Sequence, residues 1–134
     1  MFSKSTLIAV MLACAAGPMA AETPMSGAEF ESFVTGQTLT FAENGQVYGI
    51  EQYLSNRRVR WAFMGDQCRD GFWYEEAGGQ ICFVYDDLEG PQCWIFTRSG
   101  GRLMARFQGD GGRELYEAQR SEEPLRCLGP DVGV

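Results

Sequence analysis

The sequence contains no histidine, and its single lysine is Lys4. Histidine is the most common general base and zinc ligand, so triads and zinc sites that depend on it are excluded. Basic residues number 11 against 18 acidic ones, a formal net charge of -7, which gives no positive surface for a phosphate backbone. No apolar run reaches the ~18 residues that suggest a membrane-spanning helix. We therefore expect neither a nucleic-acid partner nor a transmembrane anchor.

Residues 1–21 have the pattern of a cleaved signal peptide. Lys4 provides the positive start, an apolar run extends from Thr6 to Ala16, and Pro18 interrupts it before small residues. We expect export to the periplasm or secretion, leaving residues 22–134 as a single small β domain. An alternative is lipidation of Cys14, which lies near the end of the apolar run. The residues before Cys14 fit the lipidation motif poorly.

The mature chain retains four cysteines, Cys68, Cys82, Cys93 and Cys127. An even number of cysteines in an exported chain predicts two disulfides in an oxidising compartment. Cys82 and Cys93 lie on two apolar runs at equal distances from a turn at residues 87–88, so a hairpin would bring them face to face. We therefore favour Cys82–Cys93 with Cys68–Cys127 among the three possible connectivities. A four-thiolate zinc site is the alternative, but the chain has no C-x-x-C pair.

The distribution of apolar residues and turn residues predicts one helix followed by strands. A capping-box pattern begins at Ser26, and apolar residues at helical spacing up to Gly36 predict a helix over 26–35. Leu39 and Phe41 then alternate before the hairpin signal at Asn44-Gly45. Further strands are expected at residues 46–53, 57–63, 72–76, 80–85, 92–97, 102–107 and 113–118, with an irregular tail after about Glu122 that Cys127 would hold.

Regularly spaced turns predict a mainly β fold, an antiparallel meander of about eight strands behind the short helix. Ile81, Phe83 and Tyr85 alternate with Cys82, and the same face would carry Trp94 and Phe96. Such a meander either closes into an up-and-down barrel or forms a strongly curved sheet covered by the helix. We favour the barrel.

Aromatic side chains are the main candidates for a binding site, because they could line a cavity at the mouth of a barrel. They could equally fill its interior, since an eight-stranded barrel is just wide enough to be packed by side chains or to hold one small ligand. Core filling is the more common arrangement. The candidates are Tyr48, Tyr53, Trp61, Phe63, Phe72, Trp73, Tyr74, Phe83, Tyr85, Trp94 and Phe96.

Two turns could in principle bind ions. The acidic turn at residues 86–89 offers carboxylates to calcium but lacks the spacing of an EF-hand loop. The glycine-rich turn at residues 109–112 has backbone amides for an anion but no phosphate-loop lysine. We interpret both as solvated turns, and we expect no metal and no cofactor.

Catalysis would have to rely on carboxylates, because the mature chain has neither histidine nor lysine to activate a nucleophile. The candidates are Asp66, Asp70, Glu75 and Glu76 as an acid/base pair and Ser55, Ser99 or Ser121 as nucleophiles. No motif pairs any of them with a base, so we assign no catalytic residue.

Arginine residues recur on the predicted strands and could form an anion-binding patch. Exposed strand faces are ordinarily polar, which accounts for the same residues without a ligand. The residues concerned are Arg57, Arg58, Arg60, Arg98, Arg102 and Arg106.

The order of motifs along the chain resembles a known layout. It consists of a helix followed by Gly71-Phe72-Trp73, Ile81-Cys82-Phe83-Val84-Tyr85 and Cys93-Trp94. It is similar to small exported bacterial proteins grouped in domain-of-unknown-function families, over about residues 26–107. The resemblance implies a periplasmic or secreted β protein and supplies no catalytic residue.

These patterns together favour a non-catalytic module of the cell envelope, with a binding or structural role. Its partner would be a protein, a glycan or a small ligand. The alternative is a hydrolase that uses carboxylates alone, which would require two carboxylates converging in a cleft.

Overall fold

The computed structural model describes residues 1, 12–15, 17 and 22–127. The predicted signal peptide, Met1–Ala21, therefore lies largely outside the described residues. Within the described part of the chain, none of the helical structure is long and apolar enough to cross a bilayer.

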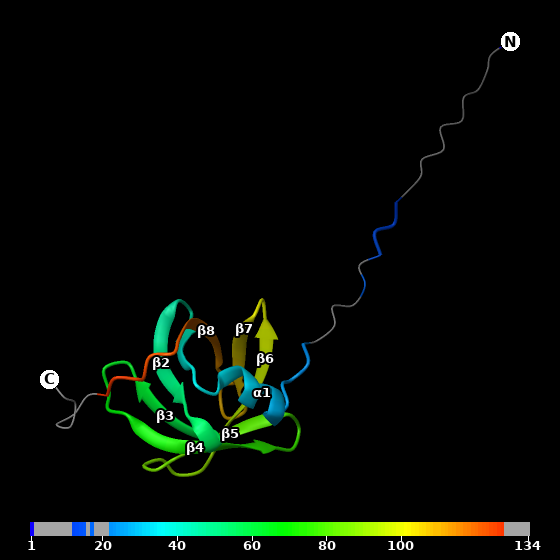
Figure 1. Ribbon diagram of the computed structural model, residues 1–134. Helices are drawn as coiled ribbons and strands as arrows, with labels where there is room; N and C mark the ends of the chain where they lie inside the picture. Colours follow the sequence, from blue (N-terminus) through cyan, green and yellow to red (C-terminus); the bar gives the residue numbers. More distant parts are fainter. Residues whose placement is uncertain (2–11, 16, 18–21, 128–134) are drawn as a thin grey trace.

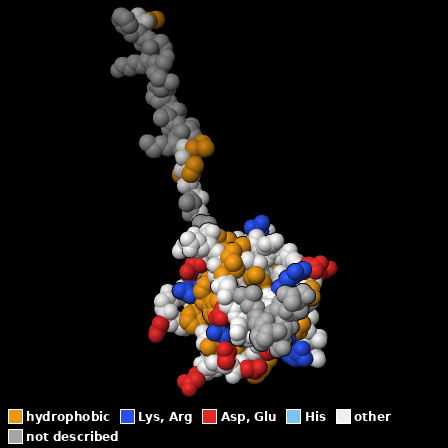
Figure 2. Space-filling view, turned by 90° about the vertical axis from the view of Figure 1, so that its left-hand side faces the viewer, with side chains coloured by type: hydrophobic (Ala, Val, Ile, Leu, Met, Phe, Trp, Pro, Cys, Tyr) orange, Lys and Arg blue, Asp and Glu red, His pale blue; other side chains and the backbone are white. Residues whose placement is uncertain are grey.

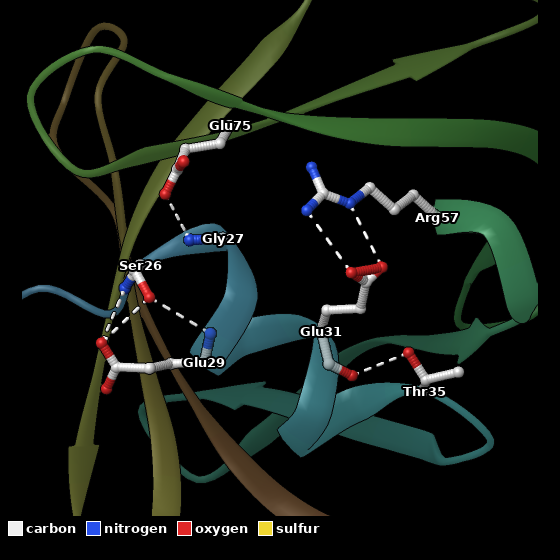
Figure 3. A network of polar contacts seen from close by, with 7 residues as sticks. All are labelled: Ser26, Gly27, Glu29, Glu31, Thr35, Arg57 and Glu75. Carbon is white, nitrogen blue, oxygen red and sulfur yellow. Dashed lines mark hydrogen bonds and ion pairs between the residues drawn. The ribbon is translucent and has the colours of Figure 1, made fainter.

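One α-helix, α1 (Gly27–Val34), precedes the strands, within the predicted range. Ser26 is its N-cap: the side chain accepts from the backbone N–H of Glu29 at 3.1 Å, and Glu29 reaches back to Ser26 (Figure 3). This capping box satisfies backbone donors that a helix start leaves free. The helix ends where Thr35 leaves helical geometry.

Eight antiparallel strands follow in sequence order and close into a barrel, as the turn spacing predicted (Figure 1). Closure comes from the pairing of the first and last strands, in which Thr38 lies opposite Ser121. A closed barrel leaves no unpaired edge. The strands are β1 (Thr38–Glu43), β2 (Gln46–Tyr53), β3 (Arg58–Phe63), β4 (Arg69–Glu76), β5 (Gln80–Tyr85), β6 (Gln92–Ser99), β7 (Arg102–Phe107) and β8 (Glu114–Ser121), and a 3-10 turn, η1 (Ser55–Arg57), precedes β3.

Both predicted disulfides are present. Cys82 lies directly opposite Cys93 in the β5–β6 ladder and is bonded to it. Cys68, before β4, is bonded to Cys127, which holds the irregular tail after β8. In that tail the backbone N–H of Leu125 donates to the side chain of Gln52 on β2.

The predicted gap between the strands at residues 57–63 and 72–76 would make Asp70 and Gly71 a turn, which is wrong, because both residues lie inside β4. Gly71 pairs with Val59 on one side and with Tyr85 on the other. A Cβ at this position would overlap the carbonyl oxygen of Val84. The glycine therefore permits a close approach between strands, which is why β4 begins three residues before the predicted start at residue 72.

Helix α1 closes one end of the barrel, where β2 and β4 finish and β3 and β5 begin. Phe30 is fully buried and contacts aromatic rings from four strands, those of Tyr53, Trp73, Phe83 and Phe96. Polar contacts fix the helix there: Arg57 of η1 pairs with Glu31 at 3.2 Å, and Glu75 of β4 accepts from the backbone N–H of Gly27 (Figure 3). The opposite end of the barrel carries the β1–β2, β3–β4, β5–β6 and β7–β8 loops.

Candidate functional site

The barrel interior contains a partly open cavity of about 80 Å³. Leu88 of the β5–β6 loop and Gln92 at the start of β6 contribute to its wall, so the cavity lies toward the end away from α1. The remaining lining is mostly aromatic, from Phe41, Tyr48, Tyr53, Trp61, Phe63, Phe83, Tyr85, Trp94 and Phe96, with Glu51, Ala105 and Leu115.

Glu51 is the one carboxylate among the residues that line this cavity. It lies on β2 between Gly49 and Tyr53 along the inward face and is only 2% exposed. The hydroxyl of Tyr85 on β5 lies 3.0 Å from its Oε1 atom and donates to it. None of the ion pairs among the described residues includes Glu51, so its carboxyl group is buried without a cationic partner.

Burial decides the protonation of this group. Loss of hydration raises the pKa of Glu51 well above its ordinary value, and the hydrogen bond from Tyr85 offsets this only in part. Burial and the neighbouring Glu51 also raise the pKa of Tyr53 and of Tyr85, so both remain phenols. The cavity wall therefore presents a carboxyl group whose charged form is disfavoured by burial, next to a phenol.

Gly49 makes room for one wall of the cavity. A Cβ at Gly49 would overlap the six-membered ring of Trp61 on the neighbouring strand β3. Trp61 in turn packs against Tyr48 and, edge to face, against Phe63, with ring centroids 5.8 and 5.3 Å apart. The glycine thus allows the indole to lie flat against the β2 backbone and leaves space beside it.

Two arginine side chains lie over the aromatic rings at this end. The guanidinium of Arg113 is 4.8 Å from the ring centroid of Tyr48 and pairs with Glu43 at 3.0 Å. That of Arg69 is 5.2 Å from the ring of Phe63 and pairs with Asp87 at 2.9 Å. Both rings also line the cavity, so two members of its aromatic wall already contact cations.

A second hollow of about 430 Å³ adjoins the cavity at its mouth. Tyr48, Gln92 and Trp94 line both spaces. The mouth is otherwise more polar, because Glu43, Asp110 and Arg113 contribute to it. A molecule longer than the inner cavity could therefore extend outward between these side chains.

The other buried carboxylate, Glu117 of β8, has a different environment. Arg120 pairs with it through Nε at 2.8 Å and also donates to the backbone carbonyl of Phe33 at 2.9 Å. Glu117 does not line the cavity. It is a paired charge that links β8 to the end of α1.

Most of the aromatic residues singled out in the sequence do meet inside the barrel, and eight of the eleven line the cavity. Trp73 packs instead against Phe30 beneath the helix. Phe72 is 49% exposed on the outside, and Tyr74 points to the same outer face of β4. The expectation of core filling holds at the α1 end, whereas the other end retains a void.

The carboxylates proposed for catalysis do not converge. Asp66 pairs with Arg69, Asp70 pairs with Arg60, and Glu75 binds the start of α1. Glu76 accepts from the next backbone N–H, at Ala77. Ser55 and Ser99 are exposed, and the Ser121 hydroxyl accepts from the backbone of Glu123.

The arginines considered as an anion-binding patch are also separated. β3 and β6 have two strands between them, and the side chains are engaged locally: Arg57 with Glu31, Arg106 with Glu114, and Arg98 over the ring of Phe33. Figure 2 shows basic and acidic side chains interspersed on the face it presents.

Among the described residues, no cluster of three His, Cys, Asp or Glu side chains that could hold a metal ion occurs. Asp87 of the acidic turn instead pairs with Arg69, and the turn lies at the mouth of the barrel. The glycine-rich turn contributes Asp110 and Gly111 to the outer hollow.

Sequence reasoning missed Glu51, the only carboxylate in the cavity wall. In β2 the apolar residue Ile50 points outward and Glu51 points inward, opposite to the usual polarity of a barrel strand. The β1–β2 ladder has a bulge at Tyr48. Because a bulge shifts the alternation of side chains, Tyr48 also faces the interior, although even-numbered residues such as Ile50 face outward. The available sequence signal was the alternation of Gly49, Glu51 and Tyr53, which places Glu51 on the same face of the strand as Tyr53.

No family model matches the chain, and comparisons with curated proteins and with solved structures also return no match. The resemblance to exported domain-of-unknown-function families therefore stays a prediction.

Proposed function

We propose that this chain is an exported, non-catalytic binding module that takes a small ligand into the barrel cavity. The observation that supports this most is a void with aromatic walls and one polar pair, Glu51 and Tyr85, at the end of the barrel that α1 leaves open. Small-molecule sites are typically concave and mostly apolar, with a few polar groups that orient the ligand.

The contrast between the two ends of the barrel also favours a binding role. At the α1 end, Phe30 and its aromatic neighbours fill the interior. At the other end, the same kind of side chains leave a void, although protein interiors are normally packed without one. Space kept open beside a buried polar pair is consistent with a ligand site.

A carboxylate hydrolase is the less favoured function. General acid/base work of that kind needs two carboxylates flanking one reacting atom. Glu51 is alone in the cavity wall, and Glu117 is neutralised by Arg120 outside it. These contacts support binding over hydrolysis.

Export is the second part of the proposal. The two disulfides are of the kind that persists in oxidising compartments. The pattern of residues 1–21 supports a route to such a compartment.

Two substitutions on β7 provide the test. Ala105 lines the cavity, so Ala105→Leu fills the space, whereas Met104→Leu changes the neighbouring outward position. Trp61 and Trp94 line the cavity and report on binding by fluorescence. We expect at least one of three probes, benzyl alcohol, 3,3-dimethylbutan-1-ol or choline, to bind the wild type and Met104→Leu saturably and to lose affinity for Ala105→Leu. Binding by none of the three, or equal binding to Ala105→Leu, would contradict the proposal.

A further inference from the structure

We propose that the ligand group held in the barrel is a small organic ammonium cation, with Glu51 as its counter-ion and the aromatic rings as its walls. The inference rests on the proposed function and specifies the chemical class of the ligand. It follows from the position of Glu51, the aromatic lining, the cavity size and the charge at the mouth.

Glu51 has unused capacity to accept a donor or to face a cation. A carboxylate offers about four lone-pair positions, and the Tyr85 hydroxyl, 3.0 Å from Oε1 and 3.3 Å from Oε2, occupies at most two of them. Arg120, whose charge acts on the neighbouring Tyr53, is committed to Glu117 and to the carbonyl of Phe33. A buried acid without a cationic partner is costly unless it is neutral or a ligand provides the charge.

The walls around Glu51 suit a positive charge. The faces of Trp, Tyr and Phe rings attract ammonium groups, and rings grouped around a cavity are a recurrent way of binding quaternary ammonium. Tyr48 and Phe63 already each have a guanidinium over the ring. No described lysine or arginine lines the inner cavity, so its interior has no positive charge that would repel such a ligand.

The size of the cavity restricts its occupant to one small group. The cavity of about 80 Å³ is smaller than a protein cavity of ~150 Å³ that accepts benzene. The outer hollow can hold a substituent of the same molecule. The acidic turn at residues 86–89 and Asp110 lie at this end, and together with the net charge of -7 they favour the approach of cations.

Binding should be coupled to a proton. In the free protein, burial favours the protonated form of Glu51 by raising its pKa. A quaternary ammonium has no proton to give, so when it binds, the O–H bond of Glu51 breaks, the carboxylate stays with the cation, and one proton passes to the buffer. The titratable groups around Glu51 are Tyr48, Tyr53 and Tyr85, with the Glu117–Arg120 pair behind Tyr53. Burial and the neighbouring Glu51 raise the pKa of Tyr53 and of Tyr85, which leaves Glu51 as the source of the proton.

The test compares choline with 3,3-dimethylbutan-1-ol, its uncharged carbon isostere. Calorimetric titration of the oxidised protein at neutral pH, in two buffers that differ in ionisation enthalpy, gives both affinity and proton release. We expect choline to bind the wild type at least about tenfold more tightly than the isostere, with release of close to one proton. Glu51→Gln should abolish the preference and the proton release, whereas the exposed control Glu76→Gln should retain both.

The outcomes separate the two proposals. Equal affinity for choline and its isostere, both lost in Ala105→Leu, would overturn the ammonium inference and leave the binding function intact. Choline binding unchanged in Glu51→Gln would also overturn it. Failure of both compounds and of benzyl alcohol to bind would overturn the binding function itself. The comparison of the two compounds and the proton count use the wild type, so they remain decisive even where Glu51→Gln does not fold.

Discussion

The Tyr85 hydroxyl lies 3.0 Å from Oε1 and 3.3 Å from Oε2 of Glu51, inside the barrel and across from the strand that carries the carboxyl group. This pair joins β5 to β2 through the cavity rather than through the sheet. It is the one side-chain hydrogen bond that joins two of the described residues lining the cavity.

Glu51→Gln should change how stability depends on pH. Because burial raises the pKa of Glu51 in the folded state, the folded chain binds a proton that the unfolded chain releases above pH ~4.3. Wild-type stability is therefore reduced as pH rises from that value to the folded pKa. Glu51→Gln has no carboxyl group to ionise, so its stability does not fall in this way. The free energy of unfolding of Glu51→Gln should therefore rise relative to that of the wild type by up to about 1.4 kcal/mol per pH unit within that window.

Denaturant unfolding at a series of pH values measures this difference. Glu76→Gln, at an exposed position, should follow the wild-type profile. A constant difference between Glu51→Gln and wild type from pH 4 to 8 would show that Glu51 is ionised in the folded barrel.

Tyr85→Phe removes the donor and leaves the carboxyl group in place. Because the hydrogen bond from Tyr85 lowers the pKa of Glu51, its loss should raise that pKa further. We expect a cost of about 1–3 kcal/mol for the unpaired buried group. Carboxyl-carbon NMR measures the titration, and Tyr74→Phe, on the outer face, serves as the control. A lower pKa in Tyr85→Phe would contradict the described pairing.

Gly49→Ala should disturb the wall of the cavity. The added methyl group overlaps the Trp61 ring, which would have to turn toward the cavity. We expect a loss of about 1–3 kcal/mol, as for other overpacked positions, and a shifted tryptophan emission. Val47→Ala, at an exposed position of the same strand, should have little effect. Wild-type stability and emission in Gly49→Ala would mean that Trp61 does not lie against β2.

The two disulfides should differ in their contribution to stability. The two cysteines of Cys68–Cys127 are 59 residues apart in the sequence, and those of Cys82–Cys93 are 11 residues apart. In the chain-entropy model their paired removal costs about 4 and about 3 kcal/mol, respectively. Paired Ser substitutions and denaturant unfolding measure both values. Equal or reversed costs would show that interactions other than chain entropy dominate.

Local sequence patterns were sufficient to predict most of the fold. The capping box at Ser26 defined the helix, and glycine-containing turns separated the strands. The hairpin register placed Cys82 opposite Cys93, and the structure has both disulfides as predicted. These features depend on residues close in sequence or on symmetric spacing about one turn.

Features that depend on contacts between strands were not predictable in the same way. Gly71 has the local pattern of a turn residue, and only its proximity to Val84 explains its position inside β4. Glu51 belongs to a strand that carries Ile50 on the outside, so alternation alone did not reveal which face is buried. The cavity itself depends on how the aromatic rings of five strands meet, and no single strand shows it.

Contact between a bound ammonium group and the inner rings is the most direct test of a ligand site in the barrel. Nuclear Overhauser effects between the methyl protons of choline and assigned ring protons measure it. We predict effects to Trp61 and Phe63 in the wild type and in Met104→Leu, and their loss in Ala105→Leu. Effects confined to exposed residues such as Phe72, or unchanged in Ala105→Leu, would contradict a ligand site inside the barrel.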